Sequence, residues 1–187
     1  IIKNPEQIQG IRESAKINIE ILDYIDEHIQ EGISTQEIDN WVCSITKKHN
    51  ATAATLNYEG YPKSVCTSLN SVVCHGIPSK NEILKDGDIV NVDASTIYKG
   101  YFSDSSRMYC IGNVSAEKRR LVEIARQSLE IGLQYVQPWR KIGDMGAAIH
   151  EFAMQNGYSV VKDIGGHGVG LEFHEDPWVS YVCLKDT

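Results

Sequence analysis

Apolar positions at two different spacings divide the chain into helical and extended stretches. From residue 8 they recur every three or four positions, which is typical of an amphipathic helix. Asn4, Pro5 and Gln7 before them form a helix start with an N-cap, a first-turn proline and a capping-box partner. We expect this helix to continue until Gly32. Its predicted inward positions are Ile8, Ile11, Ala15, Leu22, Ile25 and Ile29.

A second, shorter helix is predicted to begin at the pair Ser34 and Glu37, which has capping-box spacing, and to end near His49. Between residues 51 and 110 the pattern changes to short β-branched runs. Turn signals such as EGYPK and KDGD separate these runs. We therefore expect a sheet in this part of the chain.

The order of elements starts again at Ser115 with a long helix, a break at Pro138, a shorter helix from about Gly143 and a strand after Gly157. The predicted inward positions are Leu121, Ile124, Leu129 and Leu133 in the longer helix, and Ile149 and Phe152 in the shorter one. This repetition predicts two structural half-repeats, about 5–110 and 115–187. The second half stops soon after its first strands, so we expect sheet to be missing at its C-terminal end.

Composition narrows the classes of protein that fit. A chain of 187 residues builds one domain or two closely packed halves. Its net charge of −7 argues against a nucleic-acid partner, because such proteins concentrate lysine and arginine on one face. Five cysteines without a Cys-x-x-Cys pair indicate free thiols in a reducing compartment. With no signal-peptide pattern and no membrane-length apolar run, we expect the cytosol and no membrane partner.

Two aspartates stand in extended runs on either side of a turn at Tyr98-Lys99-Gly100. If the turn is centred between Tyr98 and Lys99, with Gly100 as a bulge, Asp93 and Asp104 are facing or diagonal neighbours. Their Cβ atoms would then be roughly 5 to 8 Å apart. Carboxylates this close repel each other, so either one is protonated or a cation lies between them. The alternative is that both face solvent, or that Asp104 pairs with Arg107.

Three histidines add imidazole to this set. His75, His167 and His174 are flanked by glycine, proline or acidic residues and not by a helical repeat. Carboxylate and imidazole without cysteine favour Mn, Fe, Co or Zn over a structural thiolate zinc site. The run GGHGVG is not a dinucleotide-binding loop, because no helix is predicted to follow it.

The runs GYPKSVCTSLNSVVCHGIP, LKDGDIVNVDASTIYKGYFSDSSRM and GGHGVGLEFHEDP, in this order, resemble the bacterial type I methionine aminopeptidases over essentially the whole chain. The resemblance implies an α+β pita-bread fold. In that fold two related α/β halves surround a curved antiparallel sheet. Residues 1–187 would then form one catalytic domain that is incomplete at its C-terminal end.

The resemblance also implies a site with two divalent metal ions (Co, Mn, Fe or Zn). Asp93, Asp104 and His167 would be ligands, and two further glutamate ligands are expected beyond Thr187. Glu172 and Glu175 do not replace them, because they belong to the segment that carries His174. The residues implied to contact substrate are His75 and His174 at the scissile amide, and Tyr58, Tyr61, Cys66 and Phe173 around the methionine side chain.

The implied activity is hydrolytic removal of the N-terminal methionine from nascent proteins and peptides by a metal-activated water. We expect a monomer with transient proximity to the ribosome. Because the glutamates are missing, we expect the 187 residues alone to be a fragment with weak metal binding and no turnover. The alternatives are a pita-bread binding module without peptidase activity, and a proline-specific aminopeptidase or creatinase-like enzyme of the same fold.

Overall fold

The computed structural model describes residues 1–182 and divides into two compact units. The first unit consists of residues 2–115 together with 169–173, and the second of residues 116–168 together with 174–182. No helix among the described residues is long and apolar enough to cross a membrane. The two units are described separately below, and the hypothesis that they are half-repeats stays a prediction.

The first unit opens with helix α1 (Pro5–His28), and its predicted start is confirmed. Asn4 caps the helix, and its side chain and that of Gln7 exchange hydrogen bonds with each other's backbone N–H groups. The helix ends earlier than predicted, at His28. Leu22 and Ile25 are buried as predicted, whereas Ile8 is exposed and Ile11, Ala15 and Ile29 are only partly buried. The buried residues are Ser14, Ile17, Asn18, Ile21, Leu22 and Ile25. Two polar residues belong to this face because they hydrogen-bond to the sheet, a pairing that apolar periodicity does not reveal.

Helix α2 (Thr35–Lys48) follows, with Ser34 accepting a hydrogen bond from the backbone of Glu37 as predicted. The predicted sheet is also present. Its antiparallel strands are β1 (Thr52–Ala53), β2 (Cys66–Leu69), β3 (Ile89–Tyr98) and β4 (Tyr101–Cys110). Strand β3 pairs with the other three strands, so it is the centre of the sheet.

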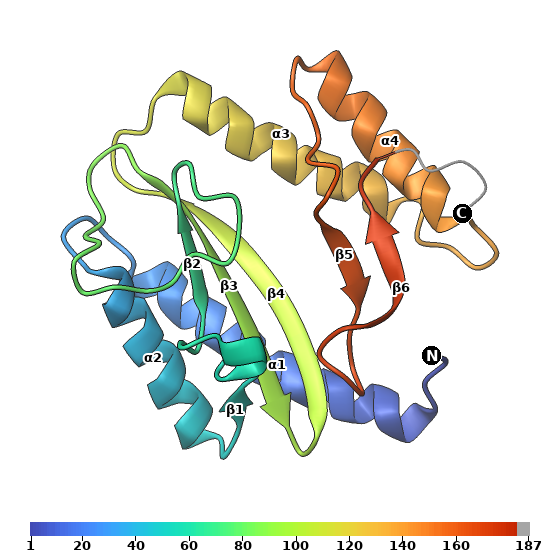
Figure 1. Cartoon of the computed structure of the whole chain (residues 1–187), viewed down its shortest axis with the longest axis horizontal. Helices are drawn as coiled ribbons and strands as arrows, with labels where there is room; N and C mark the ends of the chain where they lie inside the picture. The colour runs from blue at the N-terminus through green and yellow to red at the C-terminus, as the bar shows by residue number, and fades with distance from the viewer. Residues whose placement is uncertain (183–187) are drawn as a thin grey trace. The chain divides into compact units, whose positions relative to one another are not determined.

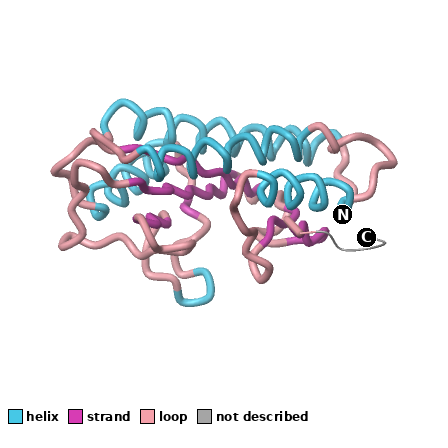
Figure 2. The backbone as a smooth tube through the Cα atoms, turned by 90° about the horizontal axis from the view of Figure 1, so that it is seen from above, coloured by secondary structure: helices cyan, strands magenta, loops and turns pink. Residues whose placement is uncertain are grey.

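Both helices of this unit pack on one face of the sheet, α1 across β3 and β4 and α2 against β1 and α1 (Figure 1). The short helix η1 (Tyr58–Gly60) lies on the other side of the sheet (Figure 2). The core between helices and sheet includes Ile21, Ile25, Ile38, Val42, Val90 and Val92. Burial of these side chains holds one face of the sheet and leaves the other available for a site.

The register of the β3–β4 hairpin differs by one residue from the prediction. Tyr98 pairs with Tyr101, so the turn is the dipeptide Lys99-Gly100, and pairing continues without a bulge from there to Ile89 and Cys110. Lys99 and Gly100 both have positive φ, at 51° and 83°. This is the two-residue turn that matches the twist of paired strands.

The second unit contains two helices and a two-stranded sheet. Its elements are α3 (Ala116–Leu133), α4 (Ile142–Gln155), β5 (Gly165–Gly168) and β6 (Glu175–Ser180). The helices pack on each other, and α4 also contacts β6. The strand predicted directly after Gly157 is not formed.

Most of the predicted inward face of α3 is exposed. Leu121, Leu129 and Leu133 are 44%, 60% and 58% exposed, whereas Ile124 is buried. Leu121, Ile124 and Leu129 line a groove of about 350 Å³ that also includes Ile149 and Tyr181. The prediction of burial was wrong for Leu121, Leu129 and Leu133 and right for Ile124. The described strands of this unit do not cover the groove.

Candidate metal centre

The two aspartates are diagonal neighbours on the central hairpin. Asp93 pairs with Ser106, and Asp104 pairs with Ser95 two residues further along β3. Paired residues lie on the same face of a sheet, and so do residues two apart on a strand. Both carboxyl groups are therefore on one face of the β3–β4 pair, as predicted, although the register that puts them there is a different one.

Electrostatics of the pair show that the carboxyl groups interact. Burial, the charge of Asp104 and a hydrogen bond between the two carboxyl groups raise the pKa of Asp93 above its ordinary value. The Ser95 hydroxyl donates a hydrogen bond of 2.8 Å to Oδ1 of Asp104. Arg107 forms its ion pairs with Asp23, at 2.8 Å, and with Asp26, both on α1. The alternative of two separate, solvated aspartates is wrong.

This arrangement fits a divalent cation. Two neighbouring carboxyl groups offer several oxygen ligands on one face of the sheet, and a cation would satisfy both charges. Among residues 1–182, no group of three or more His, Cys, Asp or Glu side chains stands in a metal-binding arrangement. The pair thus supplies part of a ligand set.

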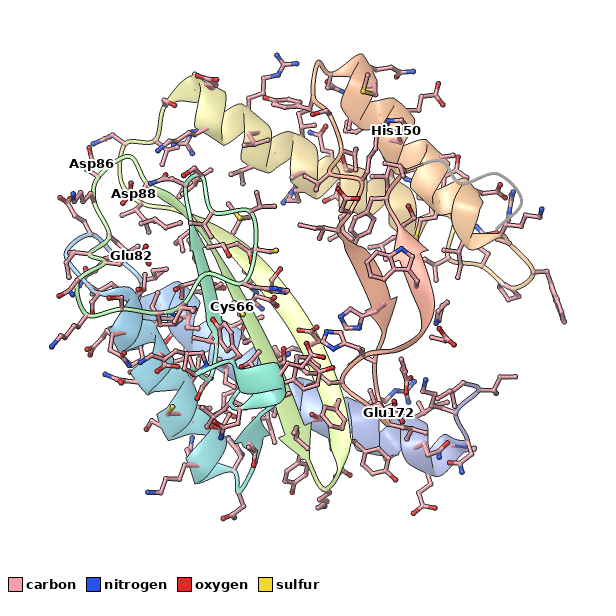
Figure 3. All side chains as sticks on the ribbon, in the orientation of Figure 1. Cys66, Glu82, Asp86, Asp88, His150 and Glu172 are labelled. Carbon is pink, nitrogen blue, oxygen red and sulfur yellow. The ribbon has the colours of Figure 1, made fainter. Side chains whose placement is uncertain are left out.

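Strand β2 brings a thiol beside the pair. Cys66, which is labelled in Figure 3, pairs with Asp93 across β2 and β3 and is buried at 3% exposure. Burial raises the pKa of the Cys66 thiol to about 11, and a hydrogen bond with Tyr61 acts in the opposite direction. The Tyr61 hydroxyl also donates to the carbonyls of Val65 and Gly76, at 3.1 and 2.8 Å. Burial raises the pKa of this phenol too.

The other two predicted pocket residues contact each other in the same unit. The rings of Tyr58 and Phe173 meet edge to face, with centroids 4.9 Å apart. Phe173 also stacks on Phe102 at 6.1 Å, and the Phe102 backbone donates to the carbonyl of Gly170. Strand β4 thus anchors the segment 169–173, which carries one of the aromatic rings. Glu172, labelled in Figure 3, lies in this segment.

His75 lies on an exposed loop between β2 and β3, with its backbone in the left-handed region at φ 54°. The next residue fixes the loop. A Cβ on Gly76 would lie 2.1 Å from the Thr67 carbonyl, while the Gly76 carbonyl accepts a 2.8 Å hydrogen bond from the Thr67 backbone. Only glycine permits the backbone to approach Thr67 this closely, and this close approach holds His75 beside β2.

The other two histidines are together in the second unit. The rings of His167 and His174 are 4.2 Å apart in an edge-to-face arrangement. Nδ1 of His167 donates to the Gly168 carbonyl at 2.8 Å, a bond that places the proton on Nδ1 and the lone pair on Nε2. The glycines around His167 serve strand pairing, since a Cβ on Gly168 would lie 2.5 Å from the Asp176 carbonyl.

Comparisons with known proteins identify the family of this chain. Residues 9–187 match the sequence profile of metallopeptidase family M24. The chain belongs to this family. Within M24, it is 46% identical over 187 residues to methionine aminopeptidase of Buchnera aphidicola, covering 99% of this chain and 70% of that protein.

Solved structures of M24 relatives confirm the expected pita-bread fold. The crystal structure of methionine aminopeptidase from Rickettsia prowazekii matches the whole chain with a TM-score of 0.96 at 39% identity, and the match covers 75% of that chain. Xaa-Pro dipeptidase from Bacillus anthracis matches 96% of this chain with a TM-score of 0.82. At 24% identity and 49% coverage of that protein, the second match shows the fold alone.

One residue at the site was missed by sequence reasoning. The Ser95 hydroxyl donates to Asp104, but the predicted turn centre lay one residue too early. It left Asp93 and Asp104 as facing or diagonal neighbours and did not reveal that Ser95 pairs with Asp104. The two-residue turn Lys99-Gly100 would have given the correct pairs, since opposite residues in a hairpin have a constant sum of numbers.

Proposed function

We propose that this protein removes the N-terminal methionine from polypeptides and that a divalent metal centre carries the hydrolysis. The observation that carries the proposal is the pair of neighbouring carboxyl groups, Asp93 and Asp104, on the face of β3 and β4 opposite helix α1. The identity of 46% to a methionine aminopeptidase, over nearly the whole chain, gives this pair its chemical context.

The proposed centre holds two ions of Co, Mn, Fe or Zn. Asp93 and Asp104 are proposed to supply oxygen ligands. His167 is proposed to bind through Nε2, because its Nδ1 donates to the Gly168 carbonyl. Two glutamates beyond Thr187 are proposed to complete the set. When bound, the ions supply Lewis-acid polarisation of the scissile carbonyl and lower the pKa of water.

The remaining residues bind and orient the substrate. His75 and His174 are proposed to donate hydrogen bonds to the scissile amide, where negative charge develops during hydrolysis. Tyr58, Phe173, Tyr61 and Cys66 are proposed to surround the methionine side chain. Aromatic rings and a thiol suit a polarizable thioether. The raised pKa of Cys66 and of Tyr61 keeps both groups neutral, as an apolar side chain requires.

The proposed partners and cellular location are those of an enzyme that acts on newly made polypeptides. Nascent polypeptides that carry an N-terminal methionine are the proposed partners, in the cytoplasm and with transient proximity to the ribosome. The enzyme is proposed to act as a monomer without a nucleic-acid or membrane partner.

A substrate panel tests this proposal. Protein expressed from the complete gene, loaded with Co²⁺, is expected to release methionine from Met-Ala-Ser. It is expected to leave acetyl-Met-Ala-Ser intact, because an aminopeptidase requires a free N-terminal amine and acetylation blocks that amine. Release is measured by chromatography of free methionine. Gly-Pro and Ala-Pro-Ala are included as substrates of proline-specific relatives.

The panel separates the alternatives. Cleavage of the proline peptides with none of Met-Ala-Ser would establish a proline-specific peptidase. Tight binding of Met-Ala-Ser without any product, in protein that contains bound metal, would establish a binding module. Either result would refute the proposed function.

A further inference from the structure

Ser95 places a hydroxyl in the interior of β3. Its side chain is 2% exposed, and a hydroxyl buried without a hydrogen bond is costly. The hydroxyl donates to Oδ1 of Asp104 at 2.8 Å, and the two residues are directly paired across β3 and β4. The contact is therefore fixed by strand register and does not depend on a long, flexible side chain.

Helix α1 holds the strand on both sides of Ser95. Ser14 donates its hydroxyl to the Thr96 carbonyl at 2.9 Å, and Nδ2 of Asn18 donates to the Ala94 carbonyl at 2.8 Å. These bonds come from the helix-covered face, opposite the face of the carboxyl groups. The backbone that carries Ser95 is thus anchored from behind.

We infer that Ser95 is a positioning residue for the metal centre: its hydroxyl fixes the rotation of the Asp104 carboxylate so that the remaining lone pairs face the cation. The inference rests on the proposed function. The terminal torsion of an aspartate is broad, so a free carboxylate samples many orientations. A donor to one oxygen removes that freedom, as partners of metal ligands commonly do.

The chain offers a matched control on the neighbouring strand. Ser106 pairs with Asp93 in the same hairpin, but it is exposed, and its hydroxyl accepts a 3.3 Å hydrogen bond from Nδ2 of Asn91. Ser106 is therefore paired with an aspartate, as Ser95 is, but its hydroxyl bonds to Asn91 and not to the aspartate. Ser106→Ala removes a hydroxyl of the same size without touching the carboxylate contact.

Metal titration tests the inference on protein expressed from the complete gene. Calorimetry with Co²⁺ alone is expected to show affinity reduced about 10-fold or more in Ser95→Ala. Ser95→Thr keeps the donor and suits a strand, so it is expected to restore affinity and the Co²⁺ absorption spectrum. Ser106→Ala is expected to match wild type. Equal affinity and identical spectra in wild type and Ser95→Ala would overturn the inference.

Thermal unfolding of the metal-free protein tests the contact without any cation. Ser95→Ala is expected to lower Tm in the wild-type background. In the Asp104→Ala background the hydroxyl has already lost its acceptor, so the same change is expected to leave Tm unchanged or raise it. Equal Tm losses in both backgrounds would overturn the inference. Absence of Co²⁺ binding in wild type would refute the proposed function and with it the positioning role, whereas this cycle would still decide whether the Ser95 hydroxyl stabilises the protein through Asp104.

Discussion

At the scale of single residues, burial sets the chemical state of the groups around the carboxyl pair. Cys66 is the clearest example, because it is buried opposite Asp93 and its thiol pKa is raised to about 11. A thiol of ordinary pKa is roughly one-quarter ionised at pH 8, whereas this one is about 0.1% ionised. The thiolate is the reactive form. The raised pKa thus favours the neutral thiol, which agrees with the proposed place of Cys66 beside the methionine side chain.

Alkylation by iodoacetamide tests this state. In native protein at pH 8, Cys74, which is exposed, is expected to react much faster than Cys66, as followed by peptide mass spectrometry. The thiol pKa lies above the pH range from 8 to 9.5. The rate of Cys66 alkylation is therefore expected to rise about 30-fold across this range. In urea the two cysteines are expected to react alike. A Cys66 rate that levels off below pH 9 would contradict the raised pKa.

Gly76 shows how one residue positions another. A Cβ at this position would lie 2.1 Å from the Thr67 carbonyl, so Gly76→Ala must displace the loop that carries His75. We expect a loss of stability of about 1–3 kcal/mol, measured by urea unfolding, together with a reduced rate of methionine release. Gly60→Ala is the control. Gly60 has a positive φ that Gly76 lacks, so alanine there strains the backbone, but its Cβ meets nothing within 4 Å and does not displace the loop that carries His75. An equal effect of both substitutions would refute the role given to close approach.

At the scale of elements, the hairpin β3–β4 and helix α1 form the support of the site. The helix face that packs on the hairpin contains Ser14 and Asn18, which hydrogen-bond to strand carbonyls next to Ser95. Asn18 also donates to the Ser105 hydroxyl at 3.1 Å. Polar side chains within an otherwise apolar face specify the register between helix and sheet.

Replacement of Asn18 tests this support. Asn18→Ala leaves the Ala94 carbonyl without its side-chain donor in a buried position, and we expect a loss of about 1–3 kcal/mol in the free energy of unfolding. Urea denaturation measures it. Arg12→Ala, at an exposed position of the same helix, is expected to change stability by less than about 0.5 kcal/mol. A loss at Asn18 no larger than at Arg12 would contradict the account.

Local signals in the sequence were sufficient for the elements but not for all of their contacts. The capping residues Asn4 and Ser34 correctly marked two helix starts, because a cap acts within one turn. The buried face of α1 was predicted only in part. Leu22 and Ile25 were correct, but Ser14 and Asn18 were missed because they are buried through hydrogen bonds to strands some 80 residues away in the chain. Such partners leave no periodic apolar signal. The carboxyl pair was predicted, whereas its serine partner required the observed register.

At the scale of the whole molecule, the second unit carries an apolar groove on α3 and α4. Leu121, Ile124 and Leu129 line it with Ile149 from α4, and Leu129 is 60% exposed. Exposed apolar patches of this kind bind hydrophobic dyes and promote association. The groove is distinct from the carboxyl pair, which belongs to the first unit.

Dye binding tests the exposure of the groove in the 187-residue chain. We expect fluorescence enhancement of anilinonaphthalene sulfonate under native conditions and a marked decrease in Leu129→Lys, which places a charge in the groove. Leu133→Lys is the matched control, because Leu133 is 58% exposed on the same helix and does not line the groove. Equal fluorescence in both variants would show that the dye binds elsewhere.

The metal centre is the central claim, and calorimetric titration of metal-free protein from the complete gene with Co²⁺ tests it most directly. Wild type is expected to bind Co²⁺, and Asp93→Asn and Asp104→Asn are each expected to weaken binding at least about 10-fold, because each removes a charged oxygen ligand. Asp86→Asn, on a loop carboxylate that hydrogen-bonds to Asn113, is the control expected to leave affinity unchanged. Wild-type protein that binds no Co²⁺, or aspartate variants that bind it as tightly as wild type, would contradict the account.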